Sequence, residues 1–475
     1  MSFTSNTFIV YFIIFFIIYW LFKEKRHQQN IFLLISNFAF YAMMDLRFAG
    51  LLLLTILSVY YAAIYCDRIS IEKRRKTILL LTIILNIGIL FLFKYYNFFA
   101  YEFCRLFNLN TDKILLNLIL PVGISFYTFT SLGYVIDVYR KKIPAIKDFL
   151  SISAFISFFP LLTSGPIERT NGLLPQFFYK RSFDYDLVCD GVQQIIYGFF
   201  KKLVIADNCA SVVSVAFGNY DNLPGSSLFV GALLYTIQIY CDFSGYSDIA
   251  IGLSKMLGFR VRKNFNYPYF ALNVSDFWKR WHMSLQSWFI DYIYIPLGGS
   301  RCSKVRIIFN TFIVFIISGI WHGSNWTFIA WGIYHAILFI PLILYCSRDF
   351  RRKTFSYDTK FPSIKELSYM LLTVMLITIG WIIFNSASIT DAIGYISSMF
   401  DYSLFSIPRN IGLPSLFYIS VLIVILFIIE WIMRSKEFAL QFKASGWVKV
   451  LILYVLIIHI IFCKAAQADF IYFQF

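Results

Sequence analysis

The chain has 475 residues, of which 59% are hydrophobic, 20% are aromatic and only 14% are charged. Soluble domains carry about 25% charged residues, and a mean hydropathy of +0.69 is too high for a water-facing surface at this length. These values exclude intrinsic disorder, collagen-like fibres and a small disulfide-stapled module. They predict an all-α integral membrane protein, because the apolar runs are longer and more continuous than the ~10-residue alternating strands of a membrane barrel.

The charge distribution indicates membrane topology. The chain carries 42 Lys and Arg against 26 Asp and Glu, a net charge of +16. Short basic stretches border the apolar runs at 23–26, 73–76 and 140–142. Because cytoplasmic loops hold an excess of Lys and Arg, we expect these stretches in the cytoplasm, near anionic lipid, and we expect no nucleic-acid partner.

The first apolar run, 8–22, is followed rather than preceded by basic residues. A cleavable signal peptide has the reverse order and ends at a small-residue cleavage site. We therefore expect a retained span whose N-terminal end faces outward.

The eight cysteines form no CxxC pair and no cluster with histidine. This spacing is not that of a disulfide framework or of a zinc site. We expect them to be apolar packing residues.

Further apolar runs follow at about 31–44, 48–66, 77–100, 114–138, 149–163, 187–217, 226–258, 305–321, 326–346, 366–385, 412–433 and 447–463. A full crossing needs about 20 residues, so the run at 31–44 is expected to be tilted or re-entrant. The pattern predicts eleven or twelve membrane segments in one polytopic domain over 1–475, with only a short soluble-looking linker at 348–365. It shows no internal repeat of the kind found in many secondary transporters.

The stretch 260–306 interrupts this pattern with charges and prolines, yet it is rich in Trp and Tyr. Within it, the spacing predicts one helix over 273–291, capped by Ser275 and supported by an Asp276–Arg280 pair. Its apolar face carries residues three and four apart: Val274, Trp278, Trp281, Leu285, Trp288 and Tyr292. Such a helix is expected to lie in the headgroup layer, where it can still line the mouth of a pocket.

Two of the five histidines favour chemistry, since an ionisable group in or beside a membrane segment is costly. His322 ends an apolar run in SGIWHGSNW, where Gly319 and Gly323 allow close approach of backbone or substrate. His282 follows two basic residues, and nearby cations lower the pKa of a histidine and keep it neutral as a base. The alternatives are a structural histidine that hydrogen-bonds a neighbouring helix, for His322, and an interfacial side chain, for His282.

The sequence lacks the residues that other kinds of catalytic or metal site require. No HExxH, GxSxG or P-loop string occurs, and the two histidines have no carboxylate or cysteine partners at ligand spacing, so no metal site is expected. Asp242 and Asp248 are six apart inside an apolar run, hence on different faces of a helix, and are expected to organise polar contacts. His335 is expected to be a packing residue.

Four strings resemble the membrane-bound O-acyltransferase (MBOAT) family, in the order in which that family has them. They are SGPIERTNGLLPQF (164–177), YCDFSGYSDIAIGLSKMLGF (240–259), NFNYPYFALNVSDFWKRWHMSLQSWFIDYIYIPLGGSR (264–301) and FIISGIWHGSNWTFIAWGIYH (315–335). The terminal FIYFQF is also similar to the bacterial branch that acetylates alginate and peptidoglycan. The recognisable core covers about 115–340, between flanking spans in 1–114 and 341–475.

The resemblance implies a helical fold around a central funnel or tunnel with two histidines at its centre. The histidine of the family's WHG string falls on His322 and that of its RWHxS string on His282. We expect His322 to be the general base and His282 to position the donor or stabilise charge, or the reverse. Arg301, Lys304 and Arg306 are candidates to hold donor phosphates, with ordinary positive-inside residues as the alternative. The residues expected to line the pocket are Trp278, Trp281, Trp321 and Asn325.

The resemblance further implies an enzyme that moves an acyl group, most simply acetyl, from a cytoplasmic thioester such as acetyl-CoA toward a cell-envelope polysaccharide. No bound cofactor is expected. We expect the protein in the bacterial cytoplasmic membrane, together with a separate extracytoplasmic esterase-like acetyltransferase. Two alternatives stay open: a non-catalytic carrier or channel for acyl or lipid-linked groups, and a scaffold for a partner transferase.

Overall fold

The computed structural model describes residues 2–111, 114–347, 349–350, 354–355, 361–442, 446–462 and 470–471. Every regular element in these ranges is a helix, which confirms the predicted fold class. By its internal contacts the chain divides into two compact units. Unit 1 comprises Met1–Val192 and Ala250–Arg262, and unit 2 comprises Gln193–Ile249 and Lys263–Phe475. Half of the linker predicted at 348–365 lies outside the described residues.

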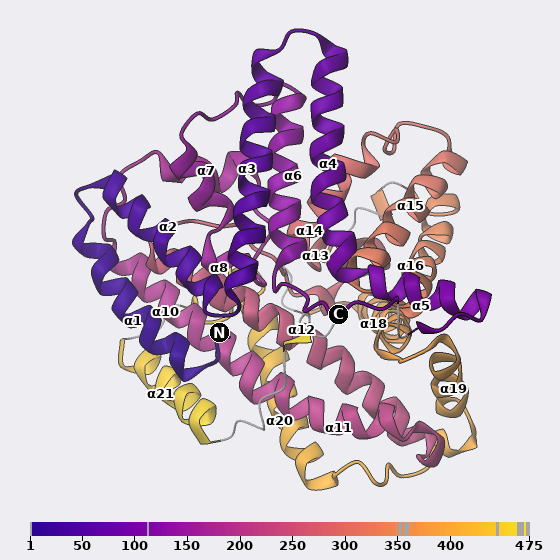
Figure 1. Cartoon of the computed structure of the whole chain (residues 1–475). Coiled ribbons are helices and arrows are strands. Elements are labelled where there is room, and N and C mark those ends of the chain that lie inside the picture. The colour runs from indigo at the N-terminus through magenta and orange to yellow at the C-terminus, as the bar shows by residue number, and fades with distance from the viewer. Residues whose placement is uncertain are drawn as a thin grey trace. The chain divides into compact units, whose positions relative to one another are not determined.

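Unit 1 is built on three helices that pack side by side (Figure 1), namely α3 (Leu46–Arg68), α4 (Glu72–Lys94) and α6 (Ile124–Tyr139). The guanidinium of Arg75 joins their ends, because it donates to the carbonyl of Cys66 at 2.9 Å and to that of Tyr139 at 2.5 Å. The basic stretches 73–76 and 140–142 therefore lie at the same end of this bundle, as a common cytoplasmic face requires.

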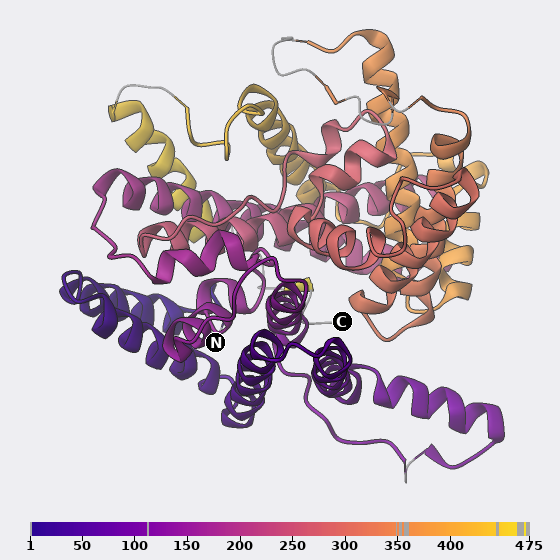
Figure 2. The ribbon, with the colours of Figure 1, turned by 90° about the horizontal axis from the view of Figure 1, so that it is seen from above.

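The other helices of unit 1 are α1 (Asn6–Leu21), α2 (Arg26–Ala42), α5 (Tyr96–Phe107), α7 (Phe149–Ile156), α8 (Phe159–Leu162), α9 (Thr170–Leu173), η2 (Leu174–Phe177) and the first half of α10 (Tyr185–Phe199). Helix α5 projects sideways from the end of α4 (Figures 1 and 2). The run at 149–163 does not form the single span that its apolar length suggests. Phe158 leaves the helical conformation between α7 and α8, and Pro160, which lacks an N–H, fits only the first turn of α8.

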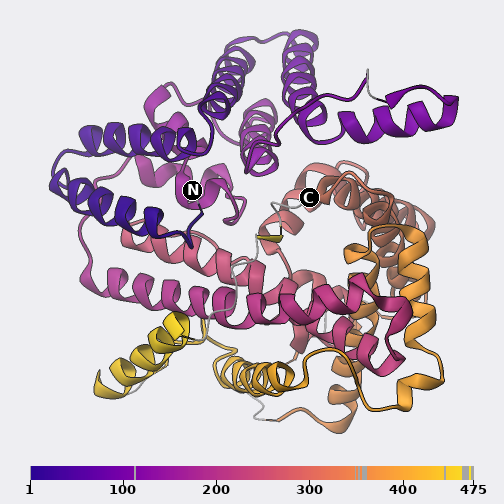
Figure 3. The same cartoon turned by 60° about the horizontal axis from the view of Figure 1, so that its bottom comes forward.

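Unit 2 contains η3 (Phe200–Ala206), α11 (Asp207–Gly218), η4 (Tyr220–Asn222), most of α12 (Gly225–Met256), η5 (Pro268–Phe270), α13 (Val274–Arg280), α14 (Met283–Phe289), η6 (Ile290–Tyr294), α15 (Lys304–His322), α16 (Trp326–Leu344), α18 (Ile364–Asn385), α19 (Ile389–Met399), η7 (Tyr402–Phe405), α20 (Leu413–Ile432) and α21 (Gly446–Phe462). Helices α15, α16 and α18 lie next to one another, brown to orange in Figures 2 and 3.

Glycines set the close packing of α15 on α16. A Cβ at Gly319 would lie 2.2 Å from the carbonyl oxygen of Phe328, and one at Gly332 would lie 2.4 Å from that of Phe315. A Cβ at Gly323 would lie 2.2 Å from the Phe328 ring. The space that Gly319 and Gly323 leave beside His322 is therefore filled by the neighbouring helix rather than kept open for a substrate.

Six of the described helices are long and apolar enough to cross a membrane: α3, α4, α12, α15, α16 and α18. Three shorter apolar helices lie at Asn6–Leu21, Leu416–Ile432 and Gly446–Phe462. Large apolar side chains remain exposed on these helices, such as Leu81 and Ile84 on α4, as lipid-facing surfaces require. The predicted total of eleven or twelve segments stays a prediction.

Two lysines of the π-helix η3 form buried ion pairs inside unit 2. Lys202 lies 2.6 Å from Asp242 and 2.8 Å from Asp207, and Lys201 lies 2.5 Å from Asp248. The two aspartates of α12 thus organise polar contacts, as predicted from their spacing. The backbone N–H of Ile471 also donates to Asp242, and the rest of the terminal FIYFQF string after Ile471 lies outside the described residues.

Candidate active site

The stretch 273–291 forms two helices rather than the single helix that its spacing predicts. Helix α13 ends at Arg280 and α14 begins at Met283. Between them, Trp281 is extended (φ −100°, ψ 126°) and His282 is left-handed (φ 45°, ψ 52°). The apolar spacing of three and four continues through this break, so periodicity alone does not reveal it.

The cap of α13 also differs from the expectation. Asn273, not Ser275, is the N-cap, and its side-chain oxygen accepts the backbone N–H of Asp276 at 2.9 Å. The predicted pair of Asp276 and Arg280 forms, with 2.9 Å between their charged atoms, and both side chains are buried.

A preceding extended segment holds the break in place. The N–H of Asn266 donates to the carbonyl of Arg280, and the N–H of Met283 donates to the carbonyl of Asn264, each at 2.9 Å. A left-handed backbone at a non-glycine residue is uncommon and costs about 1–3 kcal/mol. Such strained positions gather at functional sites, so the geometry of His282 supports a functional role.

The buried His282 side chain has a defined tautomer. Its Nδ1 lies 3.1 Å from Asn264 Oδ1, an atom that also accepts the backbone N–H of Ser284 at 3.4 Å and its hydroxyl at 2.9 Å. A backbone N–H can only donate, so the Asn264 atom that it faces is the oxygen. His282 therefore carries its proton on Nδ1, which leaves the lone pair on Nε2.

Burial lowers the pKa of His282 well below its ordinary value. The physical cause is desolvation of the charged ring rather than the neighbouring cations that the sequence suggests. His282 is consequently neutral at physiological pH.

His322, the last residue of α15, is buried among aromatic rings. Its ring centroid lies 4.9 Å from Trp321, 5.0 Å from Trp331 and 5.2 Å from Phe384. Trp321 in turn lies 5.9 Å from the ring of His282. Unit 2 thus brings His282, Trp321 and His322 together, although 40 residues of sequence separate the two histidines.

The aromatic face of the 273–291 stretch does not lie against headgroups but packs inside unit 2. Trp278 contacts Trp331, at 5.5 Å between ring centroids, and Trp281 contacts Trp381 at 4.9 Å. All four of these tryptophans are buried. Because the helix breaks at His282, one straight interfacial helix over 273–291 does not exist.

Asn325 serves as a helix cap. Its Oδ1 accepts the backbone N–H of Thr327 at 3.1 Å, and its Nδ2 donates to the carbonyl of Ala387 at 2.9 Å. These bonds fix the start of α16, three residues after His322.

Arg301, Lys304 and Arg306 lie exposed at the beginning of α15. Lys304 donates to the carbonyl of Leu344 at 2.9 Å. Because a helix rises 1.5 Å per residue, Lys304 and His322 are about 27 Å apart along the axis. The basic residues are therefore not part of the histidine site itself, and a donor that uses both would extend along α15.

Comparison with known proteins adds to this geometry. Residues 140–379, which include both histidines, match the membrane-bound O-acyltransferase family. The chain is also 36% identical over 405 residues to a probable alginate O-acetylase of Pseudomonas syringae pv. tomato, covering 85% of this chain and 76% of the relative. The chain belongs to the membrane-bound O-acyltransferase family. This membership makes it a multi-pass membrane acyltransferase and decides against a carrier or a scaffold.

Two further relatives show how far the likeness extends. A peptidoglycan O-acetyltransferase of Helicobacter pylori is 30% identical over 491 residues, covering 94% of this chain and 91% of the relative. A teichoic acid D-alanyltransferase of Bacillus subtilis is 31% identical over 237 residues, which cover only 47% of this chain and 58% of the relative. The names of these relatives all describe the transfer of an acyl group, to alginate, peptidoglycan or teichoic acid.

The structure adds residues to this candidate site that the sequence does not single out. Asn264 orients His282 from 18 residues upstream, and Trp331 and Phe384 enclose His322 from α16 and α18. No local spacing connects these positions, so only the fold identifies them. His335, by contrast, is a packing residue as expected: it is fully buried among rings, and neither ring nitrogen has a hydrogen-bond partner among the described residues.

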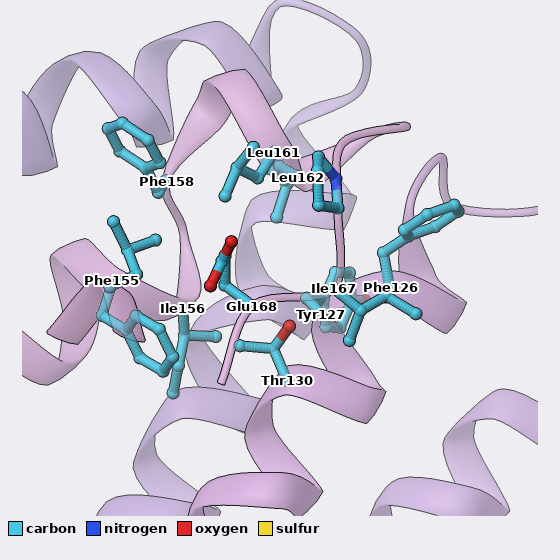
Figure 4. Close-up of a pocket in the computed structure, with 12 residues that line it drawn as sticks. Phe126, Tyr127, Thr130, Phe155, Ile156, Phe158, Leu161, Leu162, Ile167 and Glu168 are labelled. Carbon is cyan, nitrogen blue, oxygen red and sulfur yellow. The ribbon is translucent and has the colours of Figure 1, made fainter. Parts of the chain in front are cut away.

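The SGPIERTNG string of the acyltransferase lies in unit 1, beside a small hollow (Figure 4). Glu168 points into it, and its Oε1 accepts the backbone N–H of Arg262 at 2.6 Å. Burial raises the pKa of Glu168, while the neighbouring Arg262 acts in the opposite direction. The hollow measures about 20 Å³, which is room for one water and too little for a donor or a sugar. Glu168 therefore joins two segments of unit 1.

Proposed function

We propose that this O-acyltransferase moves an acetyl group from a cytoplasmic thioester, such as acetyl-CoA, toward a polysaccharide outside the cytoplasmic membrane. The relatives that cover most of the chain, named alginate O-acetylase and peptidoglycan O-acetyltransferase, support acetyl as the group and a polysaccharide as the acceptor. The observation that carries the proposal is the pair of buried histidines on either side of Trp321.

His322 is proposed as the general base. In the reaction, a hydroxyl oxygen attacks the thioester carbonyl while His322 takes the hydroxyl proton. The carbon–sulfur bond then breaks, an ester forms, and the leaving thiolate recovers the proton as a thiol. A positioned base contributes typically 10²- to 10⁴-fold to such a step, and the aromatic surroundings of His322 keep water away from the thioester.

His282 is proposed to position a substrate. Since Asn264 holds the proton on Nδ1, the Nε2 atom of the neutral ring accepts a hydrogen bond and donates none. It is suited to hold an N–H or O–H group of a substrate. It is not suited to donate to the oxyanion that develops on the thioester carbonyl. This distinction favours positioning of a substrate over stabilisation of charge as the role of His282.

The cytoplasmic end of α15 is proposed to receive the polar part of the donor. Arg301, Lys304 and Arg306 provide cations there, and phosphates pair favourably with such side chains. The donor then lies along α15, with its thioester at His322.

Delivery to the final acceptor is proposed to involve a separate extracytoplasmic esterase-like acetyltransferase. The basic loops at 23–26, 73–76 and 140–142 support an orientation with these loops in the cytoplasm. Impermeant labelling of single cysteines placed at Lys23, Lys73 and Lys141 in a cysteine-free chain tests this orientation, and labelling of all three from outside would overturn it.

Proteoliposomes that contain only this chain test the transfer itself. Labelled acetyl thioester is placed on the side of the membrane that the cytoplasmic face of the protein meets. The soluble esterase-like protein and candidate polysaccharides are added on the other side. We expect label to reach the added protein or polysaccharide only when the donor is on the cytoplasmic side. Equal transfer from a donor on either side would contradict the proposed direction, and no transfer with any thioester would refute the donor class.

A further inference from the structure

Unit 2 contains a large apolar groove that is separate from the residues around His322. It has a volume of about 620 Å³ and lies between α12, η5, α18 and α20. This size is within the ~300–1,000 Å³ of typical ligand pockets. Nearly all of its wall is hydrocarbon, from side chains such as Leu234, Ile237, Val374 and Phe427.

Two polar groups of the wall already form hydrogen bonds within the protein. The Thr236 hydroxyl donates to the carbonyl of Ala232 at 2.9 Å, and the Tyr269 hydroxyl donates to the carbonyl of Thr236 at 2.6 Å. A sugar, a peptide or a pantetheine arm would leave its own polar atoms unpaired in such a groove, at a cost in affinity. The chemistry of the wall fits a hydrocarbon chain.

The groove opens toward the lipid-facing side of the helices. Leu371 of α18 and Val424 of α20 line it and are 54% and 57% exposed. Because α18 is one of the candidate membrane spans, this opening faces the acyl chains of the bilayer.

One end of the groove carries positive charge. Trp431 lines the groove, and the Arg434 guanidinium lies 4.5 Å from the centre of its ring. The Lys263 ammonium donates to the carbonyl of Lys436 at 3.1 Å. Tryptophan and basic side chains together mark the level of the lipid headgroups, and basic clusters there attract anionic lipid. Glu437 and the buried Glu430, one residue before Trp431, are the acidic side chains nearest this end. The three cations Lys263, Arg434 and Lys436 outnumber them.

We propose that this groove binds an acyl chain of one anionic phospholipid, whose headgroup lies at Arg434. The bound chain supports the wall behind the active site, because Tyr269 lines the groove and its ring lies 6.3 Å from that of Trp281, the residue before His282. This proposal does not depend on the acyl-transfer reaction.

Filling the groove tests the acyl-chain site. Val374→Trp places a large ring in the groove, and Leu372→Trp is the matched control, since Leu372 is 58% exposed on the same helix and does not line the groove. We expect native mass spectrometry of the purified protein to show one retained phospholipid for wild type and for the control, and at least a tenfold lower retained fraction for Val374→Trp. Equal retention by both variants, or equal loss from both, would overturn the proposal.

A melting curve in the same detergent shows whether Val374→Trp is folded. A second pair of variants tests the groove independently of that result. Val424→Trp fills the exposed mouth of the groove, and Val421→Trp, 42% exposed on α20 and outside the groove, is its control. The same contrast in lipid retention is expected. A folded Val424→Trp variant that keeps its lipid contradicts the proposed site.

The headgroup part is tested by lipid competition. Arg434→Gln should lower the preference for phosphatidylglycerol over phosphatidylcholine in mixed nanodiscs by about fivefold, the effect of one basic residue near the membrane surface. Arg409→Gln, before the opposite end of α20, should leave the preference unchanged. An unchanged preference in Arg434→Gln would place the headgroup elsewhere.

Discussion

Two regions of unit 2 bury ionisable side chains in opposite ways. On η3, Lys202 lies between Asp207 and Asp242, each within 2.8 Å, so its charge meets opposite charges. Around the candidate active site, His282 and His322 are instead surrounded by rings such as Trp321. The first region keeps charges by pairing them, and the second encloses its two histidines in aromatic rings.

This difference distinguishes buried groups that stabilise the fold from buried groups that are available for a reaction. A buried charge is tolerated only when it is paired, and the pair is then fixed. A neutral histidine needs no counter-charge and stays available to accept a proton during a reaction. We therefore expect substitutions in the ionic region to reduce stability, and substitutions in the histidine region to reduce transfer by a folded protein.

The largest effect is expected for Lys202→Met. This change keeps the length of the side chain but leaves Asp207 and Asp242 buried without their cation. Removing one partner of a buried pair typically costs about 3–5 kcal/mol. The variant should melt at a much lower temperature in detergent, and its yield of folded protein should fall.

Lys255→Met is the matched control for Lys202→Met. Lys255 pairs with Asp190, whose side chain is 29% exposed, so water can hydrate the carboxylate that remains. We expect a loss of about 1 kcal/mol or less. Equal melting of the two variants would show that burial does not decide the contribution of these pairs.

The next largest effect is expected for His322. His322→Ala should reduce acetyl transfer by ~10²-fold or more, and His322→Gln should do the same, because an amide cannot accept the proton. Both proteins should stay folded, with melting temperatures near that of wild type. Labelled-acetyl transfer and a melting curve on the same samples measure both quantities. Near-normal transfer by His322→Gln would return His322 to a structural role.

The sequence predicted the parts of the molecule that depend on local pattern. Long apolar runs gave the spans α3, α4, α15, α16 and α18, since hydropathy alone distinguishes them. The pair of Asp276 and Arg280 followed from a spacing of four. The strings around His282 and His322 indicate both histidines but do not show that they lie close together in unit 2.

The remainder depends on contacts that are distant in sequence. The break at His282 interrupts a periodic pattern, and it is held by backbone bonds from 264–266, which no periodicity at 273–291 contains. The sequence also does not show why position 319 requires a glycine. The reason is that the carbonyl of Phe328, on the neighbouring helix, leaves no space for a Cβ there. Contacts that are distant in sequence therefore decide the local conformation of the candidate active site.

A smaller effect is expected for Asn264→Ala. In this variant the tautomer and the ring orientation of His282 are no longer fixed, because the acceptor of Nδ1–H is lost. We expect about a tenfold loss of transfer, typical of outer residues that orient a functional histidine. In a His282→Ala background the same change should cost almost nothing, since the two residues act together. Equal losses in both backgrounds, alongside a fall in melting temperature, would show that Asn264 acts only through stability.

The smallest effect is expected for His335→Leu, which separates a buried packing histidine from a catalytic one. His335 lies 4.9 Å from Trp331, the ring that also contacts His322, yet both of its ring nitrogens are without hydrogen-bond partners among the described residues. Replacing an unsatisfied polar side chain by an apolar one of similar size is nearly neutral. Leucine should therefore change the free energy of unfolding by less than about 1 kcal/mol and leave transfer within about threefold of wild type. His322→Leu, measured beside it, should lose transfer as His322→Ala does. If His335→Leu instead abolishes transfer in a folded protein, the aromatic cluster holds a second essential base, and the division between a packing histidine and a catalytic one fails.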